Sequence, residues 1–182
     1  MRKIADPDFI EAVNKHDVII LTETWISQKT CYNLDIQDYS SIHLYGNKSP
    51  HTRKGRFSGG ISVYFKSYIN GQISIAEKHQ TGVLWLKLCK TLFYFDSDVY
   101  VCCVYIPPKS STIHRNNVND CDMFEQIESG VEKYKSLGKI LIMGDLNSRT
   151  ANEIDYITDD DFLNQDIQLL PNVDDFPRSN KD

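Results

Sequence analysis

Apolar residues recur along this chain with two periods, one typical of helices and one typical of strands. Asp6 and Pro7 suit the start of a helix, because an aspartate caps its first turn and proline tolerates the first helical position. An apolar stripe extends that helix to about Lys15. A second helix is predicted over about 121–137, and Gly138 suits its end. Its apolar stripe is spaced by three and four residues: Phe124, Ile127, Val131, Tyr134 and Leu137.

Five strands are predicted between and around these helices. Val18–Thr22 and Lys139–Met143 are continuous apolar runs, which indicate central strands of a sheet. Gly60–Phe65 and Leu84–Leu88 alternate, so that each has one consistently apolar face, and Trp85 points away from the leucines. Val99–Tyr105 is a further buried run. The predicted fold class is α/β with sandwiched sheets.

The length and composition fit one globular domain over residues 1–182. A chain of 182 residues can bury a sizeable core, and its 41% hydrophobic and 25% charged residues are typical of globular proteins. The longest apolar runs are strand-sized, far below the roughly 18–20 residues that span a membrane. Met1–Pro7 has no apolar core of the kind found in signal peptides. We therefore expect an intracellular protein without a membrane partner.

Cysteines and charge narrow the possible sites. The five cysteines are scattered without a CxxC pair, which argues against a disulfide framework and against zinc. Cys102 and Cys103 lie in an apolar run and are expected to be buried. Trp25 and Trp85 are also expected to be buried, whereas His43 is expected at the surface.

The net charge of −5 is unevenly distributed along the chain, with nine acids and two bases in residues 153–182. The remaining body is slightly basic, which is compatible with a polyanionic substrate.

Polar residues follow three of the buried strands. Glu23 comes after Val18–Thr22, Tyr105 ends its strand, and Asp145 comes after the Lys139–Met143 strand. Residues just beyond strand ends often face a ligand cleft in α/β proteins, although capping or hydrogen bonding at a strand end is the plainer interpretation. Two carboxylates that converge there would form an all-oxygen site suited to Mg²⁺ rather than zinc.

Four motifs resemble those of the endonuclease/exonuclease/phosphatase superfamily, in the order in which that superfamily has them. They are the segment from Asp17 to Trp25, the glycine-rich strand from Phe57 to Phe65, the tyrosine-proline segment from Val101 to Pro108, and the Gly-Asp-Leu-Asn segment within Ile140 to Asn147. The sequence is most similar to the apurinic-type endonuclease domains of non-LTR (LINE-type) retrotransposons. This resemblance implies a DNase I-like fold, in which two mixed β-sheets pack face to face between helices as a four-layer α/β sandwich.

The resemblance also implies roles for four residues. Glu23 would bind a divalent metal, Mg²⁺ or Mn²⁺. Asp145 would orient or deprotonate the attacking water, or assist the leaving group. Asn147 and Tyr105 would hydrogen-bond the scissile phosphate. Metal and fixed donors together would stabilise an anionic transition state.

Three arginines are weaker candidates for contacts to substrate phosphates. Arg53 and Arg56 lie in a basic loop before Ser58-Gly59-Gly60, and Arg149 follows the Gly-Asp-Leu-Asn segment. Such contacts give affinity without sequence specificity. A solvated loop is the alternative interpretation of Arg53 and Arg56.

The resemblance further implies that both ends of the domain are absent. The superfamily pattern opens with a strand that carries an asparagine and closes with a Ser-Asp-His triplet, and neither occurs here; His114 is the last histidine. We therefore expect a chain without the first strand and the C-terminal third, with marginal stability and little nuclease activity.

Three functions are compatible with these residues and motifs. The first is the DNA endonuclease domain of a retrotransposon-derived protein, with DNA as partner and access to the nucleus. The second is a phosphatase of the same superfamily that acts on phosphoesters or inositol phospholipids. The third is a non-catalytic remnant that binds nucleic acid, which steep salt dependence without turnover would indicate.

Overall fold

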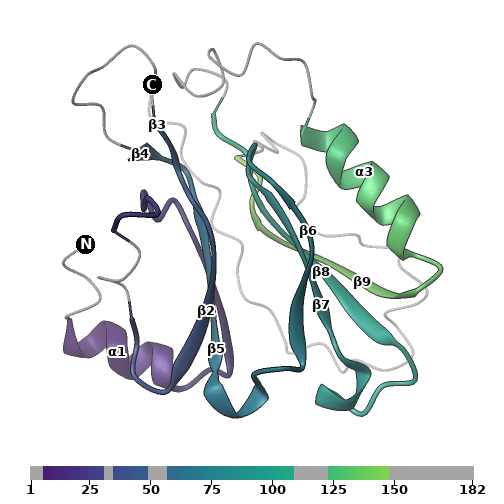
Figure 1. Cartoon of the computed structure of the whole chain (residues 1–182), viewed down its shortest axis with the longest axis horizontal. Helices are drawn as coiled ribbons and strands as arrows, with labels where there is room; N and C mark the ends of the chain where they lie inside the picture. Colours follow the sequence, from purple (N-terminus) through teal and green to yellow (C-terminus); the bar gives the residue numbers. More distant parts are fainter. Residues whose placement is uncertain (1–5, 31–34, 49–56, 109–122, 148–182) are drawn as a thin grey trace, which may run out of the picture. The chain divides into compact units, whose positions relative to one another are not determined.

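The computed structural model describes residues 6–30, 35–48, 57–108 and 123–147 (Figure 1). The chain divides into two units, Met1–Asn147 and Ser148–Asp182, and all described residues belong to the first. The expectation of a single domain over residues 1–182 stays a prediction. Within the described ranges, no helix is long and apolar enough to cross a membrane.

The first sheet contains three antiparallel strands. β5 (Ile61–Lys66) lies in the centre, with β1 (Val18–Thr22) on one side and β2 (Tyr39–Leu44) on the other. Helix α1 (Pro7–Asn14) precedes β1 and starts as predicted, because the side chain of Asp6 accepts the N–H of Asp8 at 3.1 Å.

The second sheet has four strands and is mixed. Its order is β6-β7-β8-β9, with β8 and β9 parallel and the other pairs antiparallel. Helix α3 (Met123–Tyr134) lies between β8 and β9 in the sequence, and a helical crossover is the usual link between parallel neighbours. The strands are β6 (Ile73–His79), β7 (Val83–Leu88), β8 (Asp98–Tyr105) and β9 (Gly138–Asp145). The short elements are β3 (Asn47–Lys48), β4 (Phe57–Ser58), η3 (Ser67–Ile69) and η4 (Lys90–Leu92).

The main core lies between these two sheets. Alternate residues of β5 and β7 face it, and they are joined by residues of β8: Ile61, Val63, Phe65, Leu84, Leu86, Leu88, Val99, Val101 and Cys103. On the far face of the second sheet, Trp85 packs against Tyr134 of α3 with ring centroids 5.1 Å apart. On the far face of the first sheet, α1 packs through Val13 against Tyr64. The described elements therefore form the predicted four-layer α/β sandwich (Figure 1).

Two predicted central strands are edge strands among the described residues. Within the described ranges, β1 pairs with β5 alone and β9 pairs with β8 alone. Both faces of β1 are apolar because they meet different layers: Ile20 packs on the inter-sheet core and Ile19 on the α1 side. The apolar residues on both faces of β1 therefore reflect packing against two layers. They do not require a hydrogen-bonded strand on each side of β1.

The prediction for β9 was also wrong about burial. Leu141 and Met143 are 46% and 44% exposed, and they line an apolar pocket that also includes Val18, Ile20 and Phe93. The pocket has a volume of about 290 Å³.

Smaller corrections concern single residues. Helix α3 ends at Tyr134, so Leu137 lies beyond it at 57% exposure and Gly138 opens β9. Phe124 is on the solvent side of the helix, at 56% exposure. Trp25, expected in the core, is 44% exposed. Its backbone has a φ of 52°, which turns the chain away from the line of β1.

His43 lies partly buried on the outer face of the first sheet, where a surface position was expected. Its Nδ1 lies 3.0 Å from the hydroxyl of the fully buried Ser62, and its ring meets the edge of Tyr64. Burial lowers the pKa of His43 below 6.5, the charge of Lys78 lowers it further, and Asp35 partly opposes this. The folded chain therefore favours the neutral imidazole.

We expect this histidine to make folding sensitive to mild acid. The pKa of His43 is lower in the folded chain than in the unfolded one, so the unfolded state binds more protons between the two values. Stability is then complete above the unfolded pKa of 6.5 and falls as the pH drops towards the folded pKa, by at most about 1.4 kcal/mol per pH unit for one proton. Urea unfolding between pH 7.5 and 5 should show this slope. His43→Gln should reduce it, whereas His16→Gln, at an exposed residue, should not. An equal slope in both variants would contradict the assignment.

Candidate active site

The candidate site forms where the ends of β1 and β8 meet. Tyr105, the last residue of β8, donates its hydroxyl to Oε1 of Glu23, which directly follows β1. Glu23 is exposed, whereas Tyr105 is buried, with a relative exposure of 4%. One sheet therefore supplies the carboxylate and the other supplies the phenol.

Asp145 reaches the same end of the second sheet because β8 and β9 are parallel and in register. Tyr105 and Asp145 are direct partners across the two strands. Burial raises the pKa of Tyr105 strongly, and the hydrogen bond to Glu23 and the charges of Glu23 and Asp145 raise it further. Both carboxylates thus act on one phenol, which stays protonated at neutral pH and remains a hydrogen-bond donor.

The loop after β9 is held by the carboxylate that ends this strand. Oδ1 of Asp145 accepts the backbone N–H of Asn147 at 2.9 Å. Nδ2 of Asn147 donates to the carbonyl of Ile106 at 2.7 Å, and the N–H of Ile106 donates to the carbonyl of Asp145 at 2.8 Å. An amide has two N–H donors and a carbonyl, and the contacts within the described residues use one of the two donors of the Asn147 side chain.

Three residues of the site have left-handed backbone conformations without being glycine. Their φ angles are 53° at Glu23, 52° at Trp25 and 44° at Asn147. Such conformations cost about 1–3 kcal/mol each and gather where a structure holds functional side chains. The segment with Glu23 is fixed to the glycine turn, since Trp25 N–H donates to the carbonyl of Gly59 at 2.9 Å.

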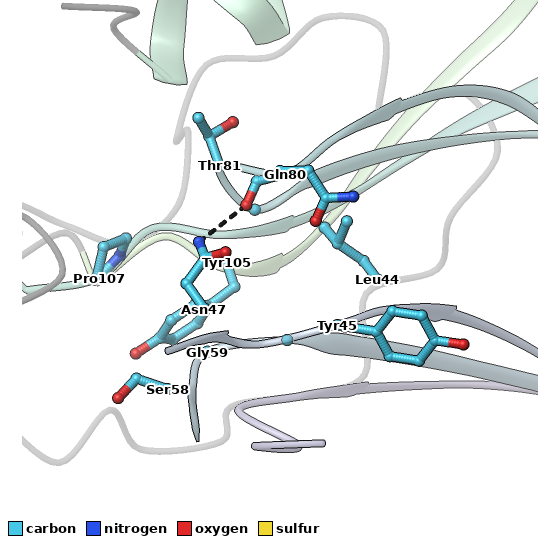
Figure 2. Close-up of a pocket in the computed structure, with 11 residues that line it drawn as sticks. Leu44, Tyr45, Asn47, Ser58, Gly59, Gln80, Thr81, Tyr105 and Pro107 are labelled. Atoms are coloured by element: carbon cyan, nitrogen blue, oxygen red, sulfur yellow. Dashed lines mark hydrogen bonds between the residues drawn. The ribbon is translucent and has the colours of Figure 1, made fainter. Parts of the chain in front are cut away.

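A small pocket lies beside Tyr105 (Figure 2). Residues of β3, β4 and the β6–β7 turn line it, and Figure 2 shows Asn47 in front of Tyr105 with a hydrogen bond to the carbonyl of Gln80. The backbone of Gly59 and the side chain of Ser58 form the opposite wall. Leu44, Tyr45 and Pro107 add apolar surface to this lining, and the pocket's volume of about 10 Å³ is enough for about one water molecule.

The oxygen donors at this site fit a hard divalent cation. Glu23 accepts the hydroxyl of Tyr105, and Asp145 lies beside Tyr105 on the neighbouring strand, so both carboxylates are near one phenol. Mg²⁺ is usually held by one or two carboxylates, with waters and substrate phosphates as its other ligands. The described residues contain no cluster of three or more His, Cys, Asp or Glu, so a cage made only of protein ligands is not what they would supply.

The structure thus brings together Glu23, Tyr105 and Asp145, with Asn147 two residues further on. The three arginines predicted to contact phosphate, Arg53, Arg56 and Arg149, lie outside the described residues. Asn47 was not among the residues predicted from the sequence, where its only signal was a short polar stretch before the basic loop.

Comparisons with known proteins bear on the fold. No family model matches the sequence, and no curated protein does either. Among solved structures, the AP endonuclease LMAP from Leishmania major is similar with a TM-score of 0.56 and 15% identity, over 80% of this chain and 49% of that one. The catalytic domain of human Nocturnin matches with a TM-score of 0.44 and 14% identity, over 82% of this chain and 57% of that one. This TM-score is below the level at which a shared fold follows.

The chain therefore spans about half the length of the AP endonuclease that it resembles. At 15% identity, that resemblance concerns the arrangement of the strands and helices. Together with the two face-to-face sheets and their flanking helices, it identifies the described part of this chain as a DNase I-like α/β sandwich.

Proposed function

We propose that this chain is part of a divalent-metal-dependent phosphodiesterase that cuts DNA, the endonuclease domain of a retrotransposon-derived protein. The observation that carries the proposal is the hydrogen bond from Tyr105 to Glu23, with Asp145 in register beside Tyr105. It places two carboxylates and a protonated donor at one end of the sandwich. The similarity to an AP endonuclease supports a nucleic-acid substrate. A DNA-cutting element would also need access to the nucleus.

The side chains have distinct tasks in this proposal. Glu23 would hold Mg²⁺ or Mn²⁺, which when bound polarises a phosphate oxygen and makes water more acidic. Asp145 would accept a proton from the attacking water. Tyr105 stays protonated, and its one hydroxyl hydrogen, which Glu23 accepts in the free chain, would pass to the phosphate when Glu23 holds the metal. Asn147 would add an amide N–H. Such fixed donors stabilise charge that develops on the phosphate.

The test is Mg²⁺-dependent nicking of supercoiled plasmid by a longer protein that carries both ends of the domain, together with Mn²⁺ binding measured by calorimetry. We expect Glu23→Gln to bring both to background, because an amide lacks the charge that holds a hard cation. Glu11→Gln makes the same change at an exposed carboxylate of α1 that pairs with Lys15, and it should leave both unchanged. Wild-type behaviour in Glu23→Gln would contradict the metal role.

The same assay separates the alternatives. Faster release of phosphate from a soluble phosphomonoester than nicking of plasmid would favour the phosphatase. Glu23-independent DNA binding with steep salt dependence and no turnover would favour the non-catalytic remnant.

A further inference from the structure

A closed circuit of contacts surrounds the candidate site, and one half of it carries Glu23. Beyond Glu23, the N–H of Thr24 donates to the carbonyl of Gly60 at 3.3 Å. The N–H of Trp25 donates to the carbonyl of Gly59 at 2.9 Å. The glycines thus hold the segment that presents the carboxylate. Any movement of this glycine turn would move Glu23.

The short strands β3 and β4 extend this half of the circuit to Asn47. Asn47 is paired with Ser58, which directly precedes the glycine turn. The N–H of Gly46 donates to the carbonyl of Ile26 at 2.9 Å. A Cβ on Gly46 would lie 2.8 Å from the carbonyl oxygen of Ser58, so the two strands are packed as closely as their backbones allow. The backbone of Asn47 is therefore coupled to the segment that bears Glu23.

The other half of the circuit carries Tyr105. The N–H of Tyr105 donates to the carbonyl of Gly82 at 2.9 Å, and a Cβ on Gly82 would lie 2.5 Å from the carbonyl oxygen of Tyr105. The hydroxyl of Thr81 donates to the side chain of Gln126 in α3 at 2.6 Å. The turn Gln80–Gly82 is therefore coupled to the strand end that bears the phenol.

Among the described residues, two hydrogen bonds join these two halves, beside a bond from Lys78 to the carbonyl of His43 that joins the same two sheets. One is the hydrogen bond from Tyr105 to Glu23, and the other is the bond from Nδ2 of Asn47 to the carbonyl of Gln80 at 3.0 Å (Figure 2). We infer that Asn47 is a positioning residue of the site: its side chain sets the separation between the segment that bears Glu23 and the segment that bears Tyr105. This inference rests on the proposed function, because the separation matters where Glu23 holds a metal beside Tyr105 and Asp145.

The experiment measures Mn²⁺ affinity and backbone amide exchange on the whole chain. We expect Asn47→Ala to weaken Mn²⁺ binding by about tenfold, the lower end of what residues that orient metal ligands cost. The amides of Trp25 and Tyr105 should exchange faster in this variant, since the loss of one bond loosens both halves of the circuit. Asn47→Gln keeps the amide donor on a longer side chain and should recover part of the Mn²⁺ affinity.

Tyr68→Phe is the matched control. It removes one exposed hydrogen bond, from the Tyr68 hydroxyl to Asp17 at 2.7 Å, at the opposite end of β1 from Glu23. It should lower the melting temperature about as much as Asn47→Ala while keeping wild-type Mn²⁺ affinity. Equal losses of affinity in the two variants, or no loss in Asn47→Ala, would overturn the positioning role.

The outcomes distinguish this inference from the proposed function. If Mn²⁺ binding depends on Glu23 but is unchanged in Asn47→Ala, the positioning role of Asn47 is refuted and the proposed metal site is not. Binding that is equally weak in the wild type and in Glu23→Gln refutes the metal site and the inference with it. Unchanged exchange of the Trp25 and Tyr105 amides in Asn47→Ala refutes the mechanical link without reference to any metal.

Discussion

Gly144→Ala should destabilise the chain by about 3 kcal/mol or more, enough to unfold a protein of marginal stability. Gly144 has a φ of 141° and pairs with Val104 across the parallel strands β8 and β9. A Cβ at this position would overlap the carbonyl oxygen of Val104. That oxygen belongs to the backbone of a buried strand, so the clash is relieved only if β9 moves away from β8.

Substitution of a second glycine, Gly71, measures the cost of backbone strain without a steric clash. Gly71 also has a positive φ, 92°, but a Cβ there would meet nothing within 4 Å. Gly71→Ala should therefore cost only the strain, about 1–2 kcal/mol. Urea unfolding followed by circular dichroism gives both values. If the two alanine variants were equally stable, the close approach of Gly144 to β8 would be refuted.

In a longer protein that carries both ends of the domain, Asp145→Asn should reduce plasmid nicking by about 10²–10⁴-fold, the range expected when a general base is removed. The amide cannot accept a proton from water at neutral pH. It keeps an oxygen in place of Oδ1, which can still accept the N–H of Asn147, so the loop after β9 should hold its conformation. The loss would then come from chemistry and not from a displaced loop.

Asp98→Asn is the control for this variant. Asp98 begins the strand that Tyr105 ends, and its carboxylate accepts the backbone N–H of Lys90 at 2.9 Å and pairs with Lys87. Its replacement removes a surface ion pair, which contributes little to stability, and this pair lies far from the candidate site. Nicking should persist in Asp98→Asn. Nicking that also persists in Asp145→Asn would show that Asp145 does not act as the base.

For β5 and β7 the sequence predicted which strand faces are buried, because alternation depends on the residues of one strand alone. Leu84 and Trp85 point to opposite cores, and Ile61 and Val63 share the inter-sheet core, as their spacing indicated. The sequence did not predict which strands lie at an edge. In β1 both faces are covered by other layers, so its composition resembles that of a central strand although β5 is its only described partner.

The candidate site was predictable to the extent that it depends on strand ends. Tyr105 and Asp145 end two parallel neighbours, and such ends lie together. Asn47 was not predictable, because its partner is a backbone carbonyl 33 residues away and any residue at position 80 would supply one. The roles of Glu23, Tyr105, Asp145 and Asn147 stay predictions until the variants above are measured.

The site is divided between two sheets that meet through side-chain packing, and this has a consequence for how the chain tolerates mutation. Glu23 depends on one sheet and Tyr105 on the other, so their alignment also depends on the apolar residues between the sheets, beside the contact that Asn47 makes. Protein interiors are closely packed and transmit small changes in volume. In a mutational scan scored for cleavage, substitutions such as Val63→Ala or Leu86→Ala would therefore rank with changes in the site itself, even in variants that remain folded. Selection for activity would act on this core as it acts on the catalytic residues.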